Sequence, residues 1–239
     1  MARRRFFVSA IHAGAAELRG EEARHLARVL RAEAGQLYEI SDNQSVWLAE
    51  IAEAQGDRVV FRTVEPVAVP EFPVRITLCA ALIKFDRFEW LVEKATELGV
   101  EKIQPVDAAR TDKGLYEASR KRSERWVRIA RESSQQARRA RVPEILPALR
   151  FEAALGVEAD HRYFLDEESA PGLLTVLPAA PAPSATVAFL VGPEGGWTDS
   201  ERAAALRTGW QPVSLGPQIL RAETATVAAM AIVVSAWSR

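Results

Sequence analysis

The spacing of apolar and polar residues changes character near residue 70. Before it, apolar and polar positions alternate over short stretches, which is typical of half-buried strands. We expect strands at 5–9, 36–40, 46–51 and 58–64, breaks at Asp42-Asn43 and Gln55-Gly56, and one helix at about 21–31. A small β-barrel is the natural closure for such strands. Residues 65–73 carry three prolines in nine, which predicts an extended linker.

From residue 74 the pattern predicts alternating strands and helices. The expected strands are at 74–82, 100–106, 144–149, 162–165, 186–191 and 213–215, and the expected helices are at 88–98, 116–139, 199–208 and 223–237. Residues 170–184, rich in Ala and Pro, are expected to form a loop. Strand–helix alternation implies an α/β fold with a parallel sheet, whose ligands bind beyond the carboxyl ends of the strands.

Helix boundaries are marked by local signals. Thr198 and Glu201 are spaced as a capping box, and Gly209 is a plausible stop for the helix that follows. The last expected helix is apolar nearly all round, so it should be buried on several sides, against its own domain and a second subunit.

Two glycine turns stand out near the C-terminus. Leu-Val-Gly-Pro-Glu-Gly-Gly-Trp occupies 190–197 and Leu-Gly-Pro-Gln-Ile-Leu-Arg-Ala-Glu-Thr occupies 215–224, and each follows a strand and opens a helix. Glycine permits close approach of a ligand, and a helix start offers free N–H groups, so the two turns together predict one ligand pocket. The simpler alternative is that these glycines only reverse the chain.

Several other kinds of site lack their sequence signals. Neither the Gly-x-Gly-x-x-Gly fingerprint nor the Gly-x-x-x-x-Gly-Lys-Ser/Thr phosphate loop is found. Three scattered histidines and a single cysteine, Cys79, suggest no metal site, and Cys79 lies in an apolar run that predicts a buried strand. With no signal peptide and no run of about 18 apolar residues, we expect no membrane partner and a cytoplasmic protein.

Charge is distributed unevenly. The net charge is −1, yet residues 110–141 contain eleven bases and four acids. Such a basic stripe suits a phosphate backbone, although a solvated helix face with internal charge pairs is an equally good interpretation.

The two turns, together with residues 84–100 and 136–143, resemble the RsmE family of ribosomal RNA uridine-N3 methyltransferases, which belongs to the SPOUT superfamily. The resemblance covers nearly the whole chain, including His-Leu-Ala-Arg-Val-Leu-Arg at 25–31. It implies a SPOUT-type parallel sheet with a C-terminal trefoil knot. It also implies a PUA-like RNA-binding β-barrel at 1–68 and a methyltransferase domain for donor binding and dimerisation at 74–239.

The same resemblance implies S-adenosyl-L-methionine as the cofactor. The residues implied to hold it lie in the two turns: Leu190, Gly192, Gly195, Gly196, Leu215, Gly216, Ile219, Leu220 and Thr224. For any one of the leucines, a role in the core is an equally good interpretation.

Methylation at N3 of uracil needs removal of the N3 proton and stabilisation of the resulting anion. Arg221 is the candidate for stabilising that charge, and Glu223 or Glu194 for accepting the proton. Glu223 could instead serve the helix start, and Arg221 could pair with it. Positioning alone, with no dedicated base, is a further alternative.

The expected RNA partner is small-subunit ribosomal RNA, naked or in the assembled subunit. The residues expected to bind it are Arg4, Arg28, Arg31, Lys84, Arg87, Arg110, Gln136 and Arg139. The sequence departs from the family pattern at 109–113 and at Arg138, within this RNA-facing part. Trp90 and Trp126 are expected in the core. The alternatives are the same fold acting on another RNA nucleotide, and a non-catalytic RNA-binding or ribosome-assembly factor.

Overall fold

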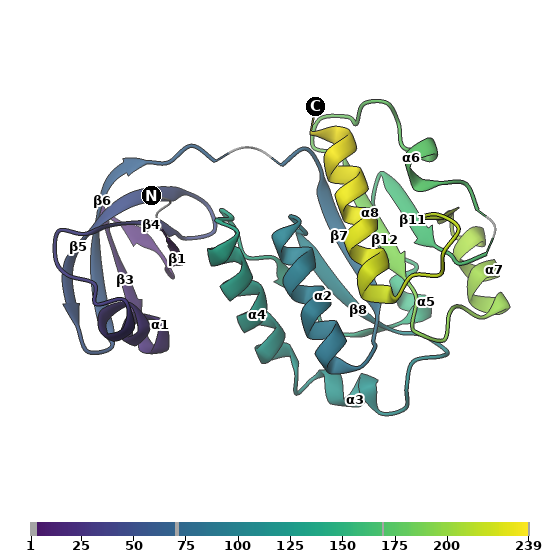
Figure 1. The fold of residues 1–239 in the computed structure, drawn as a ribbon, viewed down its shortest axis with the longest axis horizontal. Helices are drawn as coiled ribbons and strands as arrows, with labels where there is room; N and C mark the ends of the chain where they lie inside the picture. Colours follow the sequence, from purple (N-terminus) through teal and green to yellow (C-terminus); the bar gives the residue numbers. More distant parts are fainter. Residues whose placement is uncertain (1–3, 70–71, 169, 239) are drawn as a thin grey trace. The chain divides into compact units, whose positions relative to one another are not determined.

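The computed structural model describes residues 4–69, 72–168 and 170–238, so part of the expected linker lies outside the described residues. The chain divides into two compact units (Figure 1). The first unit comprises Met1–Glu71 and Arg131–Val142, and the second comprises Phe72–Ala130 and Pro143–Arg239. Helix α4 (Ser123–Gln136) therefore begins in the second unit and ends in the first. Nothing in the pattern of residues 131–142 indicates that this segment packs with the first unit.

The first unit is built on one six-stranded sheet. Its strands are β1 (Arg5–Phe7), β2 (Ile11–His12), β3 (Ala15–Arg19), β4 (Leu37–Ser41), β5 (Val46–Gln55) and β6 (Arg58–Pro66), in the order β1-β4-β5-β6-β3-β2. All pairs are antiparallel except β1 with β4. Within residues 4–69 the end strands β1 and β2 do not pair, so the sheet of this PUA-like unit is a half-barrel.

The helix expected at 21–31 forms in two parts. Helix α1 (Gly20–Arg24) continues into a π-helical turn, η1 (His25–Val29), closed by a bond from Leu30 N–H to His25 O at 3.1 Å. Leu26 is buried there, while Val29 is two-thirds exposed. A π-turn holds one extra residue, which displaces the following side chains from the helical stripe. The period-3.6 pattern cannot reveal that displacement.

The second unit is a parallel α/β fold, as expected. Its strands are β7 (Arg75–Ala81), β8 (Lys102–Asp107), β9 (Glu144–Ile145), β10 (Leu149–Arg150), β11 (His161–Leu165), β12 (Thr186–Val191) and β13 (Gln211–Val213). The order is β10-β8-β7-β12-β11-β13, with β9 also on β8, and every pair is parallel. The carboxyl ends of β11, β12 and β13 therefore meet at one edge.

Side chains of the central strands alternate between two cores. Ala188 and Leu190 of β12 pack with residues of α5 (Phe151–Ala154) and α7 (Asp199–Arg207). On the opposite face, Phe189 contacts the ring of Tyr163 at 5.8 Å between centroids. There α2 (Phe85–Glu97) and α8 (Ala222–Trp237) lie side by side (Figure 1).

The prediction of one long basic helix at 116–139 is wrong. The structure has α3 (Leu115–Ser119) and then α4, separated by a turn. The hydroxyl of Ser119 donates to Tyr116 O at 2.6 Å and that of Ser123 to Arg120 O at 3.0 Å. Serine hydroxyls compete with the backbone in this way, so they favour an interruption. A short helix, α6 (Leu173–Val176), also lies within the expected loop.

Local signals elsewhere are confirmed. Thr198 caps α7 in a capping box: its side chain accepts from Glu201 N–H at 3.3 Å, and its N–H donates to Glu201 Oε2 at 2.9 Å. Cys79 is fully buried in β7, and burial raises the pKa of its thiol to about 12. Trp126 is buried as expected, but Trp90 is 43% exposed, so its placement in the core was wrong.

Candidate functional site

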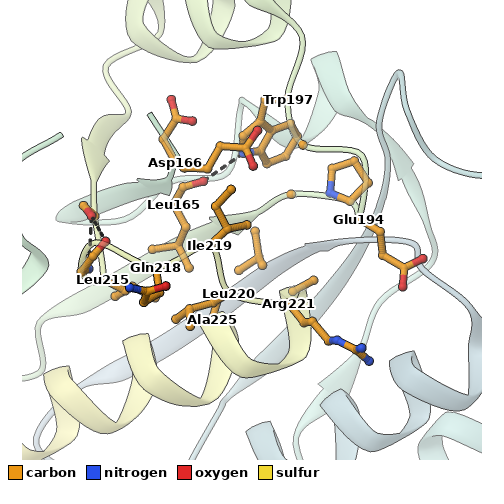
Figure 2. Close-up of a pocket in the computed structure, with 18 of the residues that line it drawn as sticks. Leu165, Asp166, Glu194, Trp197, Leu215, Gln218, Ile219, Leu220, Arg221 and Ala225 are labelled. Atoms are coloured by element: carbon orange, nitrogen blue, oxygen red, sulfur yellow. Dashed lines mark hydrogen bonds between the residues drawn. The ribbon is translucent and has the colours of Figure 1, made fainter. Parts of the chain in front are cut away.

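A cavity of about 260 Å³ opens at the carboxyl ends of three neighbouring strands (Figure 2). Both glycine turns contribute to its wall, and so does the short segment after β11. Its volume lies just below the range of about 300–1,000 Å³ usual for small-molecule sites. The lining residues are Arg87, Leu165, Asp166, Glu167, Val191, Gly192, Pro193, Glu194, Gly196, Trp197, Val213, Ser214, Leu215, Gly216, Pro217, Gln218, Ile219, Leu220, Arg221, Ala222 and Ala225.

The first glycine turn is held by the indole of Trp197. Its Nε1–H donates to Leu165 O at 3.0 Å, which ties the turn after β12 to the end of β11. A Cβ on Gly192 would approach the indole to 3.0 Å. Gly196 has φ +69° and a Cβ there would lie 2.4 Å from Glu167 Oε1. These glycines therefore admit two side chains that larger residues would displace.

The second turn leaves its backbone available. The segment 214–221 has no helix or strand, and Ile219 is 79% exposed. Among the described residues, the N–H groups of Leu215, Gln218, Ile219 and Leu220 donate to no other backbone group. These residues are exposed or half-buried, so water can accept from their N–H groups and a ligand can replace that water.

These features fit S-adenosylmethionine. Apolar side chains of Leu215, Ile219 and Leu220 supply an apolar slot for an adenine, and the free N–H groups beside them supply hydrogen-bond donors for its edge. The sulfonium and ammonium of this donor are cationic, and Asp166 and Glu167 bring negative charge to the cavity wall.

An ion pair fixes Asp166 at the end of β11. Arg202 Nε donates to Asp166 Oδ1 at 3.1 Å and to Oδ2 at 3.0 Å, and both side chains are largely buried. Burial lowers the pKa of Arg202, but the hydrogen bond that it donates to Asp166 and the nearby carboxylate charges outweigh this effect and raise the pKa above its ordinary value. Arg202 Nη1 also donates to Trp197 O at 3.0 Å, so one guanidinium orders two walls of the cavity.

Glu194 and Arg87, predicted as a proton acceptor and an RNA-binding residue, form an ion pair with each other. Each side chain is about one-third exposed, so the pair is weakly held and Glu194 can exchange partners. Arg221 lies at the same cavity, and no carboxylate of the described residues pairs with it. The alternative in which Arg221 pairs with Glu223 is therefore not seen.

Glu223 does not line the cavity. It lies in the first turn of α8, where its Oε2 is buried without a hydrogen-bond partner. Arg221 is the N-cap, and no side chain caps this helix by a hydrogen bond. A carboxylate in the first turn is still stabilised by the helix dipole, which is the role that the structure supports for Glu223.

The structure brings most of the predicted cofactor residues together. Gly192, Gly196, Leu215, Gly216, Ile219 and Leu220 line the cavity, whereas Leu190, Gly195 and Thr224 do not. Leu190 is fully buried in the core against α5 and α7. A Cβ on Gly195 would meet the side chain of Arg110 at 3.2 Å, and Thr224 is exposed on α8.

The residues predicted to bind RNA are mostly exposed but differ in their partners. Arg110 donates to Gly195 O at 2.8 Å and to Trp197 O at 3.2 Å, so it braces the first glycine turn. Elsewhere in the basic stripe, Arg122 and Arg125 pair with Glu89, and Arg131 pairs with Glu22. The side chains of Arg4, Arg28, Arg31, Lys84 and Gln136 are exposed, and that of Arg139 is half-buried.

Sequence reasoning missed the wall formed by the end of β11. Leu165, Asp166 and Glu167 line the cavity, yet no glycine turn marks them. The available signal was that acidic residues directly follow a buried strand of a parallel sheet, where ligands bind.

Comparison with known proteins gives this geometry a context. A family profile described as "RNA methyltransferase domain" matches residues 70–234, and one described as "RNA methyltransferase PUA domain" matches residues 18–64. Ribosomal RNA small subunit methyltransferase E of Synechocystis sp. is 36% identical over 87% of this chain and 68% of its own length. The protein of the same name from Bacillus subtilis is 30% identical over 90% of this chain and 87% of its own length.

Solved structures agree in fold. Ribosomal RNA small subunit methyltransferase E from Neisseria gonorrhoeae, bound to S-adenosyl methionine, superposes with a TM-score of 0.89 at 30% identity, covering 99% of this chain and 98% of that one. A methyltransferase from Legionella pneumophila in complex with the same cofactor also gives 0.89, at 26% identity, over 99% of both chains.

Two further findings concern the described residues alone. Nowhere in residues 4–69, 72–168 and 170–238 do three His, Cys, Asp or Glu side chains gather as metal ligands would. None of the helices in these ranges is long and apolar enough to cross a membrane. The matched domains, the two glycine turns at one cavity and the relatives above lead to one assignment: the chain belongs to the RsmE family of ribosomal RNA methyltransferases.

Proposed function

We propose that this chain transfers a methyl group from S-adenosyl-L-methionine to N3 of a uridine in 16S ribosomal RNA. The observation that carries the proposal is the cavity that both glycine turns line, with Arg221 on its wall. When bound, the donor supplies a methyl group on a positively charged sulfur.

Residues of the chain itself bind the donor, stabilise charge and accept the proton. Leu215, Ile219 and Leu220 bind the adenine and exclude water from it. Arg221 stabilises the negative charge that develops on the uracil once N3 has lost its proton, an effect that is strongest in a site closed to water. Glu194 accepts that proton or orients a water that does, after exchanging its contact with Arg87.

We further propose that exposed basic residues of both units hold the RNA, and that the enzyme is a cytoplasmic homodimer with a C-terminal trefoil knot. The apolar character of α8 supports a second subunit, because Val227, Ile232 and Val234 are only half-buried in the single chain. The substrate is small-subunit ribosomal RNA, naked or in the assembled particle.

Two measurements test this function. Calorimetry should detect binding of S-adenosylmethionine to the wild type and its loss in Gly196→Val, where a side chain would displace Glu167. Mass spectrometry of 16S RNA from cells with and without the gene should show 3-methyluridine only when the gene is present. Donor binding with unchanged 3-methyluridine would favour another target nucleotide, and absence of donor binding would favour a non-catalytic assembly factor.

A further inference from the structure

The cavity has an acidic wall whose charge is not balanced. The guanidinium of Arg202 lies within ion-pair distance of four carboxylates, at 3.0 Å from Asp166, 3.1 Å from Glu168, 3.4 Å from Asp199 and 3.6 Å from Glu167. One positive charge cannot neutralise four negative ones. The group therefore keeps a net negative charge beside the cavity.

Only two of these four carboxylate residues line the cavity. Asp166 and Glu167 line the cavity, whereas Glu168 and Asp199 do not. Asp166 is largely buried and its two oxygens are occupied by Arg202, so it supplies a fixed negative charge behind the wall. Figure 2 shows Asp166 on the opposite side of the cavity from Arg221.

Glu167 is placed to contact a ligand directly. Its side chain is 40% exposed, and its carboxylate accepts no hydrogen bond from the described residues. The carboxylate lies against Gly196, where the missing Cβ leaves room for it. Of the cations in the part of the chain that the structure describes, only Arg202 lies within ion-pair distance of it, at 3.6 Å, which is long for a direct hydrogen bond.

We infer that Glu167, supported by Asp166 and Arg202, recognises a cationic group of the methyl donor. The inference rests on the proposed function and adds a specificity-determining residue to it. Methyl transfer removes one positive charge: the new bond forms between N3 and the methyl carbon, and the electrons of the broken C–S bond stay on sulfur. A carboxylate at this wall therefore favours the donor over its demethylated product wherever it faces the sulfonium.

Three ligands with the same adenine and ribose separate the possible contacts. S-adenosylmethionine carries a sulfonium and an ammonium, S-adenosylhomocysteine only the ammonium, and methylthioadenosine neither. Calorimetry on the full chain compares wild type, Glu167→Gln and Glu167→Asp. The matched control is Glu168→Gln, which also removes a carboxylate from Arg202 but lies outside the cavity wall.

Glu167→Gln should weaken S-adenosylmethionine binding by about three- to fivefold, the upper range for one partly exposed charge contact, and leave methylthioadenosine within about twofold. Glu167→Asp should retain most of the affinity, and Glu168→Gln should change no ligand by more than about twofold. Loss for S-adenosylmethionine alone assigns the contact to the sulfonium, and equal loss for S-adenosylhomocysteine assigns it to the ammonium.

Two results would overturn the inference. Equal weakening of methylthioadenosine would mean that Glu167 contacts the ribose or adenine, and unchanged affinity for all three ligands would mean that it contacts none. In both cases the wild type still binds the donor. A wild type that binds none of the three ligands would instead contradict the proposed function itself.

Discussion

At the scale of single residues, Arg221 is the side chain on which the proposed mechanism depends most. It is the N-cap of α8, it is exposed, and it lines the cavity without an ion-pair partner among the described residues. An arginine with a structural task normally has an acceptor to satisfy its donors. Its position therefore suits a group that arrives with the substrate.

Arg221→Ala should lower turnover by about 100- to 1,000-fold, as the loss of one charge-stabilising donor does elsewhere, and leave the Kd for S-adenosylmethionine nearly unchanged. Single-turnover kinetics and calorimetry measure the two quantities separately. Arg221→Lys keeps the charge but not the planar guanidinium, so its turnover should lie between that of the wild type and that of the alanine variant. A collapse of donor binding in the alanine variant would refute the assignment.

At the scale of elements, α7 depends on its first turn. Thr198 and Glu201 satisfy each other's backbone N–H groups, and Glu201 also accepts from Ala109 N–H at 2.8 Å. The same helix carries Arg202, so its start sets the position of the acidic wall.

Thr198→Ala should reduce the free energy of unfolding by about 1 kcal/mol, the usual cost of losing an N-cap. Thr198→Ser keeps the hydroxyl, so its free energy of unfolding should fall much less. Urea titration of both variants measures the difference. Equal stability of the alanine and serine variants would show that the capping box contributes little here.

Strand β7 gives a prediction on pH. The pKa of the Cys79 thiol is about 12 in the folded chain. It is about 8.5 in an unfolded one. The buried thiol therefore contributes stability that is complete below pH 8.5 and is lost as the pH rises toward 12.

Between pH 8.5 and 10, the wild type should lose about 1–2 kcal/mol more unfolding free energy than Cys79→Ala, which has nothing to titrate at this position. Urea titrations at each pH give both values, and the alanine variant accounts for every other group that titrates in that range. If the free energies of unfolding of the two proteins changed equally with pH, the raised pKa of the Cys79 thiol would be contradicted.

Some elements of the fold could be predicted from the sequence, and others could not. Strands β7, β8, β11 and β12 and the start of α7 follow from apolar runs and capping residues, which act over a few positions. The single strand expected at 144–149 is instead two short strands, β9 and β10. The acidic residues after β11 carried a sequence signal, but assigning them to the same cavity as the two glycine turns requires knowing that β11 lies between β12 and β13. Likewise, the extra residue in η1 and the serine-bonded break before α4 interrupt patterns that look continuous in the sequence.

At the scale of the whole molecule, the first unit is assembled from two distant stretches of chain. Glu39 of β4 is buried and accepts from Arg5 at 2.8 Å and, through its other oxygen, from Arg138. Ser41 donates to Ala140 O at 2.6 Å. This use of Arg138 accounts for one departure from the family pattern without involving RNA.

Glu39→Leu should destabilise the chain by about 3–5 kcal/mol, because it leaves Arg5 buried without a counter-charge. Arg138→Ala removes the more exposed partner and should cost no more than about 1 kcal/mol. Chemical denaturation of the two variants tests the contrast. Similar losses in both would mean that the buried guanidinium finds another acceptor.

The split composition of the first unit limits its use as an exchangeable module. Residues 4–69 hold the sheet, but Glu22, Glu39 and Ser41 all bond to groups within residues 131–142. A graft that moved only the N-terminal stretch to another protein would leave these partners behind. Transplanting this unit, by recombination or by engineering, therefore requires three coordinated junctions in the gene rather than one.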